Sequence, residues 1–380
     1  MKIPPFQLEE FWDEHEWSTP FLLCCSDAES WSLQELLRHA DGEGRILWEG
    51  LRLGYTEPSG LPLLREEIAR LYDSVSPDHV TTFAGAEDGI YCAMQALVSP
   101  HDHVIVVTPC YQSLFTLPTV LGAEVTALQL QCRPAGWSFT IEELEQAFRP
   151  NTKLVVLNFP HNPTGALLDR PGFDRLVELA RQRGAYIFSD EVYRYLEIDE
   201  GERSPSIADT YEKGVALNAM TKAFGLAGLR IGWLASQDAA VIQRAASYKL
   251  YTSICNSAPS EVLALIALRA KETLLERNRQ IMLANLALLD QFFARHTQLF
   301  RYIRPQAGTS LFPELCSNVS SQEFMEQLLA DQGVLIMPGS LFNIPGNHFR
   351  MGFGRRNMPE VLSRFEQFLE KNEKRLLGNQ

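Results

Sequence analysis

The spacing of apolar residues predicts two helices between residues 60 and 100. Leu64, Ile68, Leu71 and Tyr72 recur at helical intervals, and Pro62 stands where the first turn of a helix accepts proline. The same spacing predicts a second helix, marked by Ile90, Met94, Leu97 and Val98. Each helix is expected to pack one apolar face against a core.

Three short runs of β-branched and other apolar residues follow, and each is closed by polar residues or proline. They cover residues 104–107, 154–157 and 185–188. Apolar runs of this length, separated by helical patterns, are typical of strands in a mostly parallel sheet that helices cover on both faces. Ligands bind beyond the carboxyl ends of such strands, so the residues that follow the runs are the first candidates for chemistry.

The last third of the chain has a different pattern. A mainly helical stretch is followed by short strands and helices, which is typical of a smaller α+β unit. The expected elements are helical residues 261–296, a strand over 307–312, a helix from about Gln322, strands over 334–337 and 348–353, and a terminal helix. We predict an α/β fold with a three-layer, mostly parallel large domain (residues 46–275) and a smaller α+β domain (residues 1–45 and 276–380).

Composition narrows the class of protein. The 380 residues carry a net charge of -13 and no block of Lys and Arg, so no nucleic-acid partner is expected. Apolar runs end well before the roughly 20 residues that span a bilayer, and the N-terminus lacks a secretory pattern, so we expect a cytoplasmic protein without a membrane partner. Seven cysteines without a CxxC pair predict neither a disulfide framework nor a metal site, and Cys24 and Cys25 are expected in a buried strand.

The segment from Asn218 to Trp233 carries the strongest chemical signal. Lys222 stands among small and apolar residues, with two glycines between it and Arg230. Partial desolvation lowers the pKa of such a lysine and favours the nucleophilic amine, which forms a Schiff base with an aldehyde cofactor. A solvated surface lysine is the alternative for an isolated residue, but two further segments fit the same chemistry.

Two polar segments follow predicted strands. Residues 160–165 read PHNPTG, where Asn162 offers an amide to a ligand, and a plain turn is the alternative. Residues 189–193 read SDEVY, where the carboxylate of Asp190 suits a protonated heterocyclic nitrogen, as a pyridine-based electron sink requires. The alternative for Asp190 is the N-cap of a helix.

With an FRMGFG run at residues 349–354, these segments make the chain resemble the class I/II aminotransferases, a family of fold-type I pyridoxal-phosphate enzymes. The likeness extends from Leu53 to Phe353. It implies pyridoxal 5′-phosphate as the cofactor and Lys222, Asp190 and Tyr193 as the catalytic residues. Lys222 would hold the cofactor as a Schiff base and move a proton at the α-carbon of the substrate.

The resemblance also implies roles for the residues around this lysine. Asp190 would pair with the pyridine nitrogen, and Tyr111 would stack on the ring. Asn162 and Tyr193 would hydrogen-bond the phenolic oxygen, with Asn162 also beside the substrate. Arg350 would bind the α-carboxylate in a bidentate manner.

The cofactor phosphate has an expected place with a physical rationale of its own. Residues 85–89 precede a predicted helix, and helix N-termini bind anions through free N–H groups and the helix dipole. We expect the backbone of Ala86 and Glu87 to contact the phosphate and Arg230 to neutralise it. As an alternative, Glu87 and Asp88 only favour the dipole.

Tyr55 resembles the family tyrosine that reaches the phosphate of the neighbouring subunit, which implies a homodimer with shared active sites. A tyrosine in a Gly/Pro turn is the alternative.

Ala219 departs from the family, which commonly has Ser or Thr there as a phosphate ligand, and Thr221 is the nearest hydroxyl. Residues 22–27 lack the family's glycine-containing turn, so the specificity is expected to be atypical.

The leading interpretation is an aminotransferase that moves an α-amino group between an L-amino acid and a 2-oxo acid. Elimination, cyclisation or oxidase chemistry, as in capreomycidine synthase-like enzymes and C–S lyases, is the alternative, because all these reactions need the α-carbanion. A non-catalytic regulator would need an appended DNA-binding domain, but residues 2–47 are acidic and aromatic.

The placement of charged residues in the sequence bears on the donor amino acid. No second arginine is placed to bind a distal carboxylate, which disfavours aspartate and glutamate. Acidic residues expected near the pocket entrance, Glu14, Asp27 and Glu57, predict donors with lysine- or arginine-like side chains.

Overall fold

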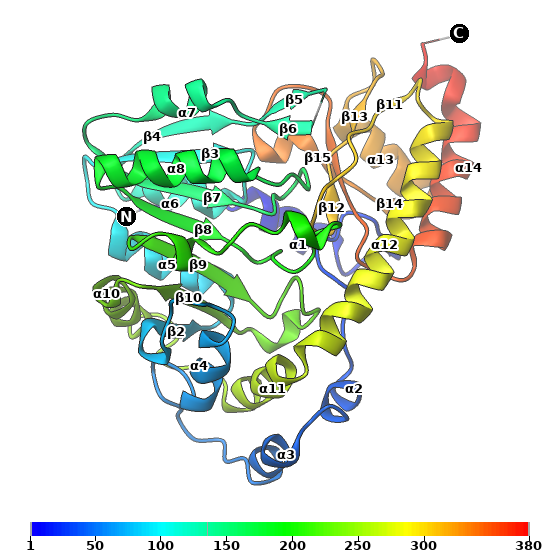
Figure 1. The fold of residues 1–380 in the computed structure, drawn as a ribbon. Helices are drawn as coiled ribbons and strands as arrows, with labels where there is room; N and C mark the ends of the chain where they lie inside the picture. Colours follow the sequence, from blue (N-terminus) through cyan, green and yellow to red (C-terminus); the bar gives the residue numbers. More distant parts are fainter. Residues whose placement is uncertain (1, 135, 379–380) are drawn as a thin grey trace.

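The computed structural model describes residues 2–134 and 136–378, and a seven-stranded sheet forms its centre (Figure 1). The strand order is β2-β10-β9-β8-β7-β3-β4. The run from β9 to β4 is parallel, and β10 is antiparallel to both of its neighbours. The strands are β2 (Val80–Phe83), β3 (His103–Thr108), β4 (Glu124–Gln129), β7 (Thr152–Asn158), β8 (Tyr186–Asp190), β9 (Gly214–Ala219) and β10 (Gly232–Ser236). The predicted mostly parallel sheet is confirmed.

Both faces of this sheet are buried. Val104 and Val106 of β3 belong to one apolar core, whereas Ile105 and Val107 belong to the other, because successive side chains of a strand point to opposite faces. The helices that contribute to the first core are α5 (Ala86–Leu97), α6 (Gln112–Val120) and α10 (Ala239–Lys249). Those that contribute to the second include α4 (Pro62–Ala69), α7 (Ile141–Ala147), α8 (Arg170–Arg183) and α11 (Ala258–Arg269). The molecule is therefore an α/β protein with three layers.

Small sheets and long helices form the C-terminal part. The antiparallel sheet consists of β12 (Ser310–Leu311), β16 (Phe349–Gly352) and β15 (Met337–Pro338). Beside it, β1 (Phe21–Leu22) pairs with β14 (Val334–Leu335), and β11 (Phe300–Arg301) pairs with β13 (Glu314–Leu315). The helices are α12 (Lys271–Arg295), α13 (Ser321–Gln332) and α14 (Met358–Leu376), drawn in yellow to red in Figure 1. The pairing of β1 with β14 joins the N-terminal segment to this lobe.

The remaining elements are short. They are helices α1 (Gln7–His15), α2 (Leu33–Leu37), α3 (Gly42–Glu49) and α9 (Ile207–Thr210), and the hairpin of β5 (Gln131–Arg133) and β6 (Gly136–Ser138). Helix α12 runs without a break through residue 275, so no change of secondary structure marks the predicted boundary there. The division into residues 46–275 and the two flanking segments remains our proposal. No helix in the described part of the chain is long and apolar enough to span a bilayer.

Four local predictions about these elements were wrong. The strand expected over 334–337 is split into β14 and β15, which belong to different sheets. Cys24 and Cys25 are buried, but they lie after β1 and not in a strand. Only Phe21 and Leu22 of this segment pair with β14, and the carbonyl of Cys24 accepts a hydrogen bond from Arg350 instead. The strand expected over 307–312 is only Ser310–Leu311, since the N–H of Ala307 donates to Gly165 instead of to a strand. Helix α4 ends at Ala69, short of the predicted face at 71–72.

Candidate active site

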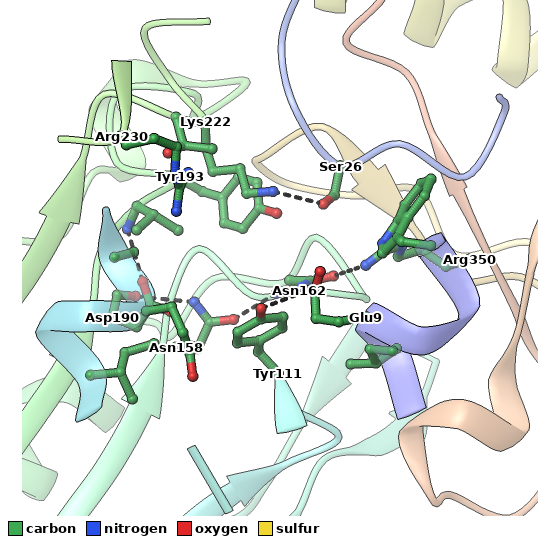
Figure 2. A pocket seen from close by; sticks show the side chains of 17 residues that line it. Glu9, Ser26, Tyr111, Asn158, Asn162, Asp190, Tyr193, Lys222, Arg230 and Arg350 are labelled. Atoms are coloured by element: carbon green, nitrogen blue, oxygen red, sulfur yellow. Dashed lines mark hydrogen bonds between the residues drawn. The ribbon is translucent and has the colours of Figure 1, made fainter. Parts of the chain in front are cut away.

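A pocket of about 330 Å³ opens where β7 and β8 end (Figure 2). Asn158 and Asp190, the last residues of these strands, lie in its wall. The lining residues are Leu8, Glu9, Trp12, Ser26, Ala86, Glu87, Ile90, Tyr111, Asn158, Asn162, Asp190, Val192, Tyr193, Thr221, Lys222, Arg230 and Arg350. The pocket thus brings together all the predicted site residues except Tyr55.

Lys222 projects into the pocket from the turn that follows β9. Its Nζ donates to Oγ of Ser26, 3.1 Å away and 196 positions earlier in the sequence. The same Nζ lies 5.9 Å from the centroid of the Tyr193 ring. The amine therefore stands between the large sheet and the N-terminal segment, with one hydroxyl partner and one aromatic face.

Asp190 occupies the floor of the pocket. It is 5% exposed, and one carboxyl oxygen accepts the N–H of Val192 at 3.2 Å. Burial raises the pKa of Asp190 to about 7, although the nearby amine of Lys222 acts in the opposite direction. No helix begins at Asp190, because the chain continues into turns, so the alternative of a helix N-cap is wrong.

Asn158 links Asp190 to Asn162, and its side chain was not among the predicted site residues. Its Nδ2 donates to the carbonyl of Asp190 at 3.1 Å, and its Oδ1 accepts the N–H of Asn162 at 3.1 Å. Tyr193 is buried beside this chain of bonds, and its hydroxyl has no hydrogen-bond partner among the described residues. The position of Asn158 at the end of a strand was the signal that could have identified it.

The opposite end of the pocket is built around the start of α5. The helix begins at Ala86, although residues 85–89 were all predicted to precede it, because Gly85 adopts a φ of 92° and serves as its N-cap. A Cβ at position 85 would collide with the guanidinium of Arg230. The glycine therefore lets Arg230 lie directly beside free N–H groups of the helix, and Gly232 leaves room for the backbone of the same turn.

The two acids in the first turn of α5 point in different directions. Asp88 accepts from Thr252 and Ser253, away from the pocket, and stabilises the loop that follows α10. Glu87 lines the pocket and accepts from Oγ of Ser113 at 2.9 Å. Desolvation raises the pKa of Glu87 to about 7. Near neutral pH, a fraction of Glu87 is therefore protonated, which reduces repulsion of an anion at this end.

Ala219 is fully buried and is not among the pocket-lining residues. Thr221 lines the pocket instead, as the nearest hydroxyl in this segment. Among residues 219–221, Thr221 is thus the one side chain with a hydroxyl that lines the pocket.

Arg350 enters from β16, on the opposite side of the pocket from Arg230 in Figure 2. Its Nε and Nη2 donate to the carbonyl of Cys24 at 3.2 and 2.9 Å, and its Nη1 donates to Oδ1 of Asn162 at 3.1 Å. The guanidinium is buried and lies 5.6 Å from the ring centroid of Phe342. The side chain is therefore fixed in place by three donors before any carboxylate binds.

Tyr55 lies outside the pocket of its own chain. Its side chain is 92% exposed, in a stretch that also exposes Leu53. Tyr251, on the loop after α10, is 91% exposed. The structure does not bring Tyr55 to the other predicted site residues within one chain.

Helix α1 closes one side of the pocket, although none of its residues was predicted to lie there. Leu8, Glu9 and Trp12 line the pocket, and Oε1 of Glu9 accepts the hydroxyl of Tyr111 at 2.6 Å. Burial raises the pKa of Tyr111, so its hydroxyl stays protonated and donates. The amphipathic pattern of residues 7–15 was visible in the sequence, but only the fold places it at the pocket.

The three acids predicted at the pocket entrance do not line the pocket. Asp27 pairs with Arg355 at 3.0 Å and is not among the pocket-lining residues. Glu14 lies on the outer side of α1, and Glu57 is exposed in the loop before α4. These three acids therefore give no support to the prediction of a donor with a cationic side chain.

The residues in the pocket fit pyridoxal phosphate group by group. Lys222 offers a primary amine for the aldehyde, and Asp190 offers a buried carboxyl for the pyridine nitrogen. The hydroxyl of Tyr193, buried without a partner in the described part of the chain, is available to the phenolic oxygen. The turn at Gly85, with Arg230 against it, suits the phosphate. Fold and site together define a pyridoxal-phosphate-dependent transferase.

The chain belongs to the aminotransferase class I and II family, whose model matches residues 28–365. It is a pyridoxal-phosphate-dependent aminotransferase, which transfers amino groups between amino acids and oxo acids, and not a regulator without catalysis. This confirms the resemblance, the cofactor and the reaction class that the sequence predicted. Elimination or cyclisation chemistry has no better support.

Three similar proteins illustrate the breadth of this family. An aspartate aminotransferase of Thermotoga maritima is 30% identical over 335 residues, which cover 86% of this chain and 85% of the relative. An arginine–pyruvate transaminase of Pseudomonas aeruginosa is 30% identical over 310 residues, covering 78% and 77%. The crystal structure of a PLP-dependent aminotransferase from Streptococcus suis is 35% identical, with a TM-score of 0.91 and coverage of 98% and 99%.

Proposed function

We propose that Lys222, Asp190 and Tyr193 are the catalytic residues of this aminotransferase and that Arg350 binds the α-carboxylate of the substrate. One observation carries the proposal: the amine, the carboxyl and the guanidinium come from separate elements and face one pocket of about 330 Å³ (Figure 2). Convergence of titratable groups in one cleft is typical of active sites.

The cofactor, when bound, supplies an aldehyde that condenses with amines and a ring that accepts electrons from the α-carbon. Asp190 would hold the pyridine nitrogen in its protonated form, because a buried carboxylate is stabilised by a cationic partner. Asn162 and the hydroxyl of Tyr193 would donate to the phenolic oxygen, and Tyr111 would cover one face of the ring. The N–H groups of Ala86 and Glu87, with Arg230 and Thr221, would bind the phosphate.

Lys222 has two tasks in this proposal. Its amine would hold the cofactor before the substrate arrives, and it would then move a proton as a general base and acid, from the substrate α-carbon to the cofactor. Ser26, 3.1 Å from Nζ, would orient the amine. Arg350 would fix the α-carboxylate, with Asn162 beside it, so that the α-carbon lies within reach of Lys222.

We also propose that the enzyme works as a homodimer in which Tyr55 reaches the phosphate of the partner subunit. Tyr55, Leu53 and Tyr251 are each more than four-fifths exposed, and large apolar side chains so exposed are typical of surfaces that a partner covers. Size-exclusion chromatography with light scattering measures the mass, and a monomer at micromolar concentration would contradict the proposal.

A cytoplasmic location is a further proposal. All seven cysteines are unpaired, which fits a reducing compartment, since disulfides persist mainly in oxidising ones. Cell fractionation of the natural host tests this, and recovery of the protein outside the cytoplasmic fraction would contradict it.

The visible spectrum of the cofactor-loaded protein tests the reaction. Anaerobic addition of an amino acid donor should remove the absorption band of the lysine-bound cofactor, and a 2-oxo acid should restore it. Release of ammonia without formation of pyridoxamine phosphate would instead support elimination or cyclisation. No cofactor band after loading would contradict the assignment of Lys222.

A further inference from the structure

Helix α1 is tied to the start of α6 and presents one face to the pocket. The ring of Phe6 lies 5.2 Å from that of Tyr111, and Nε2 of Gln112 donates to the carbonyl of Pro5 at 2.8 Å. Leu8 and Trp12 are four positions apart, so they share the face that carries Glu9. The helix therefore forms a wall of the pocket on which one side chain, Glu9, is charged.

The carboxylate of Glu9 has capacity left for a ligand. Oε1 accepts the hydroxyl of Tyr111, and no Lys, Arg or His of residues 2–134 and 136–378 forms an ion pair with this carboxylate. A carboxylate offers about four acceptor positions, so most of them remain open. In contrast, Asp27 in the neighbouring segment is already paired with Arg355.

The charges in the pocket are distributed unevenly. Arg230 lies at the Gly85 end, whereas Arg350 and Glu9 lie on the other side in Figure 2. No other arginine and no lysine besides Lys222 lines the pocket in the described part of this chain. If Arg350 takes the α-carboxylate, the side chain of the donor meets Leu8, Glu9 and Trp12. A distal carboxylate there would face a like charge and no counter-ion from the described residues of this chain, whereas a distal cation would face Glu9 and an indole ring.

We propose that Glu9, assisted by Trp12, selects donor amino acids whose side chains end in a cation, either an ammonium or a guanidinium group. The inference rests on the proposed function of Arg350 and Lys222 and adds the substrate class. It replaces the three acids that the sequence had suggested with one acid that lines the pocket. Glu9 is also a positioning residue for Tyr111, so the test must separate the two roles.

The Glu9→Gln variant separates charge from position, because the amide still offers an oxygen to Tyr111. We expect wild type to use arginine and ornithine better than norleucine, and both better than aspartate. In Glu9→Gln, the ratio of kcat/KM for arginine to that for norleucine should fall about fivefold at low salt, as for an exposed ion pair, and less at high salt. Glu9→Lys should lower the ratio further and raise kcat/KM for glutamate.

Glu10→Gln is the matched control, because Glu10 carries the same charge on the same helix but does not line this pocket. In Glu10→Gln, the ratio of kcat/KM for arginine to that for norleucine should equal the wild-type ratio. Equal losses for arginine and norleucine in Glu9→Gln would mean that Glu9 acts only through Tyr111, and this would overturn the proposal. A wild-type preference for aspartate would overturn it as well.

A binding measurement distinguishes this inference from the proposed function. Calorimetry on cofactor-loaded Lys222→Ala protein, with and without Glu9→Gln, compares the Kd of arginine with that of norleucine. If arginine binds more tightly only when Glu9 is present, the inference holds even where no donor is transaminated. If wild type transaminates donors but the Kd ratio does not depend on Glu9, the inference fails and the proposed function stands.

Discussion

The side chains of Arg350 and Asn162 meet across the pocket, where Nη1 of the arginine donates to Oδ1 of the amide over 3.1 Å. Arg350 belongs to a strand of the C-terminal lobe, and Asn162 follows β7 of the central sheet. Nε and Nη2 are occupied by the carbonyl of Cys24. The guanidinium is therefore oriented by both parts of the chain before substrate binds, and little ordering remains to be done on binding.

Replacing Arg350 by lysine should reduce binding of every amino acid donor. Lysine keeps the charge but cannot donate in a bidentate manner to a carboxylate, so kcat/KM should fall roughly 10²-fold, as for loss of a charge-assisted bond. Steady-state kinetics with several donors measures the effect, and the cofactor content should not change. Arg375→Lys, at an exposed site on α14, is the control. A loss restricted to one donor would contradict this role.

Replacing Lys222 by alanine should abolish turnover and leave the fold intact. The amine is both the attachment point and the proton carrier in our proposal, so the loss should be at least about 10³-fold. Turnover and far-ultraviolet circular dichroism are measured together. Lys213→Ala, a surface substitution outside the pocket, should remain active. Full activity of Lys222→Ala would refute the mechanism.

Asp190→Asn should make the cofactor-free protein more stable and the enzyme less active. Burial raises the pKa of Asp190 from 3.8 to about 7, so its contribution to stability is fully present below 3.8 and is lost as the pH rises through 7. At pH 8 the buried, ionised carboxylate lowers the free energy of unfolding by at most about 4 kcal/mol, and asparagine removes this loss. Thermal unfolding at pH 8 and pH 4 should show a gain only at pH 8.

The Asp190→Asn variant should also lose activity. Asparagine cannot stabilise a protonated pyridine nitrogen, so kcat should fall by more than about 10²-fold. A variant that is more stable at pH 8 and equally active would show that Asp190 is buried for another reason.

Glu87→Gln should strengthen cofactor binding at alkaline pH. Desolvation raises the pKa of Glu87 to about 7, so the side chain is mainly neutral at pH 5.5 and mainly negative at pH 8.5. The negative form repels a phosphate at the start of α5, and glutamine removes this repulsion. The Kd of pyridoxal phosphate should fall several-fold at pH 8.5 and little at pH 5.5, as measured by equilibrium dialysis. The same change at both pH values would mean that charge is not the cause.

Mixing the Tyr55→Ala and Lys222→Ala variants should restore activity at low cofactor concentration if Tyr55 serves the partner subunit. Tyr55→Ala should weaken cofactor binding about tenfold or more, through loss of a hydrogen bond to phosphate. In a hybrid with Lys222→Ala, one site combines the intact Lys222 of one subunit with the intact Tyr55 of the other. Turnover at low cofactor concentration should rise after subunits are exchanged. No rise, with hybrids verified by mass, would place Tyr55 outside the shared site.

Much of the site was predictable because its residues occur in short ordered segments. Residues 160–165, 189–193 and 349–354 each follow or form a strand, and parallel strands bring their carboxyl ends to one edge. Asn162 and Asp190 were therefore singled out without coordinates, whereas Arg350, on an antiparallel strand of the C-terminal lobe, was predicted from the resemblance to the family. Asn158 was missed because its position at a strand end was the one signal for it, and a single asparagine adds no distinctive spacing.

The sequence by itself determined the class of fold, because period-two and period-3.6 patterns are properties of neighbouring residues, and its ordered motifs carried the resemblance that implied the cofactor and the reaction. It did not determine which acid reaches the pocket. Glu9 and Tyr111 are 102 positions apart, and only the docking of α1 against the start of α6 brings them to 2.6 Å. Contacts of this kind depend on how distant segments pack, and local patterns carry no information about that distance. Tertiary structure decided the walls of the pocket, and with them the proposed choice of substrate.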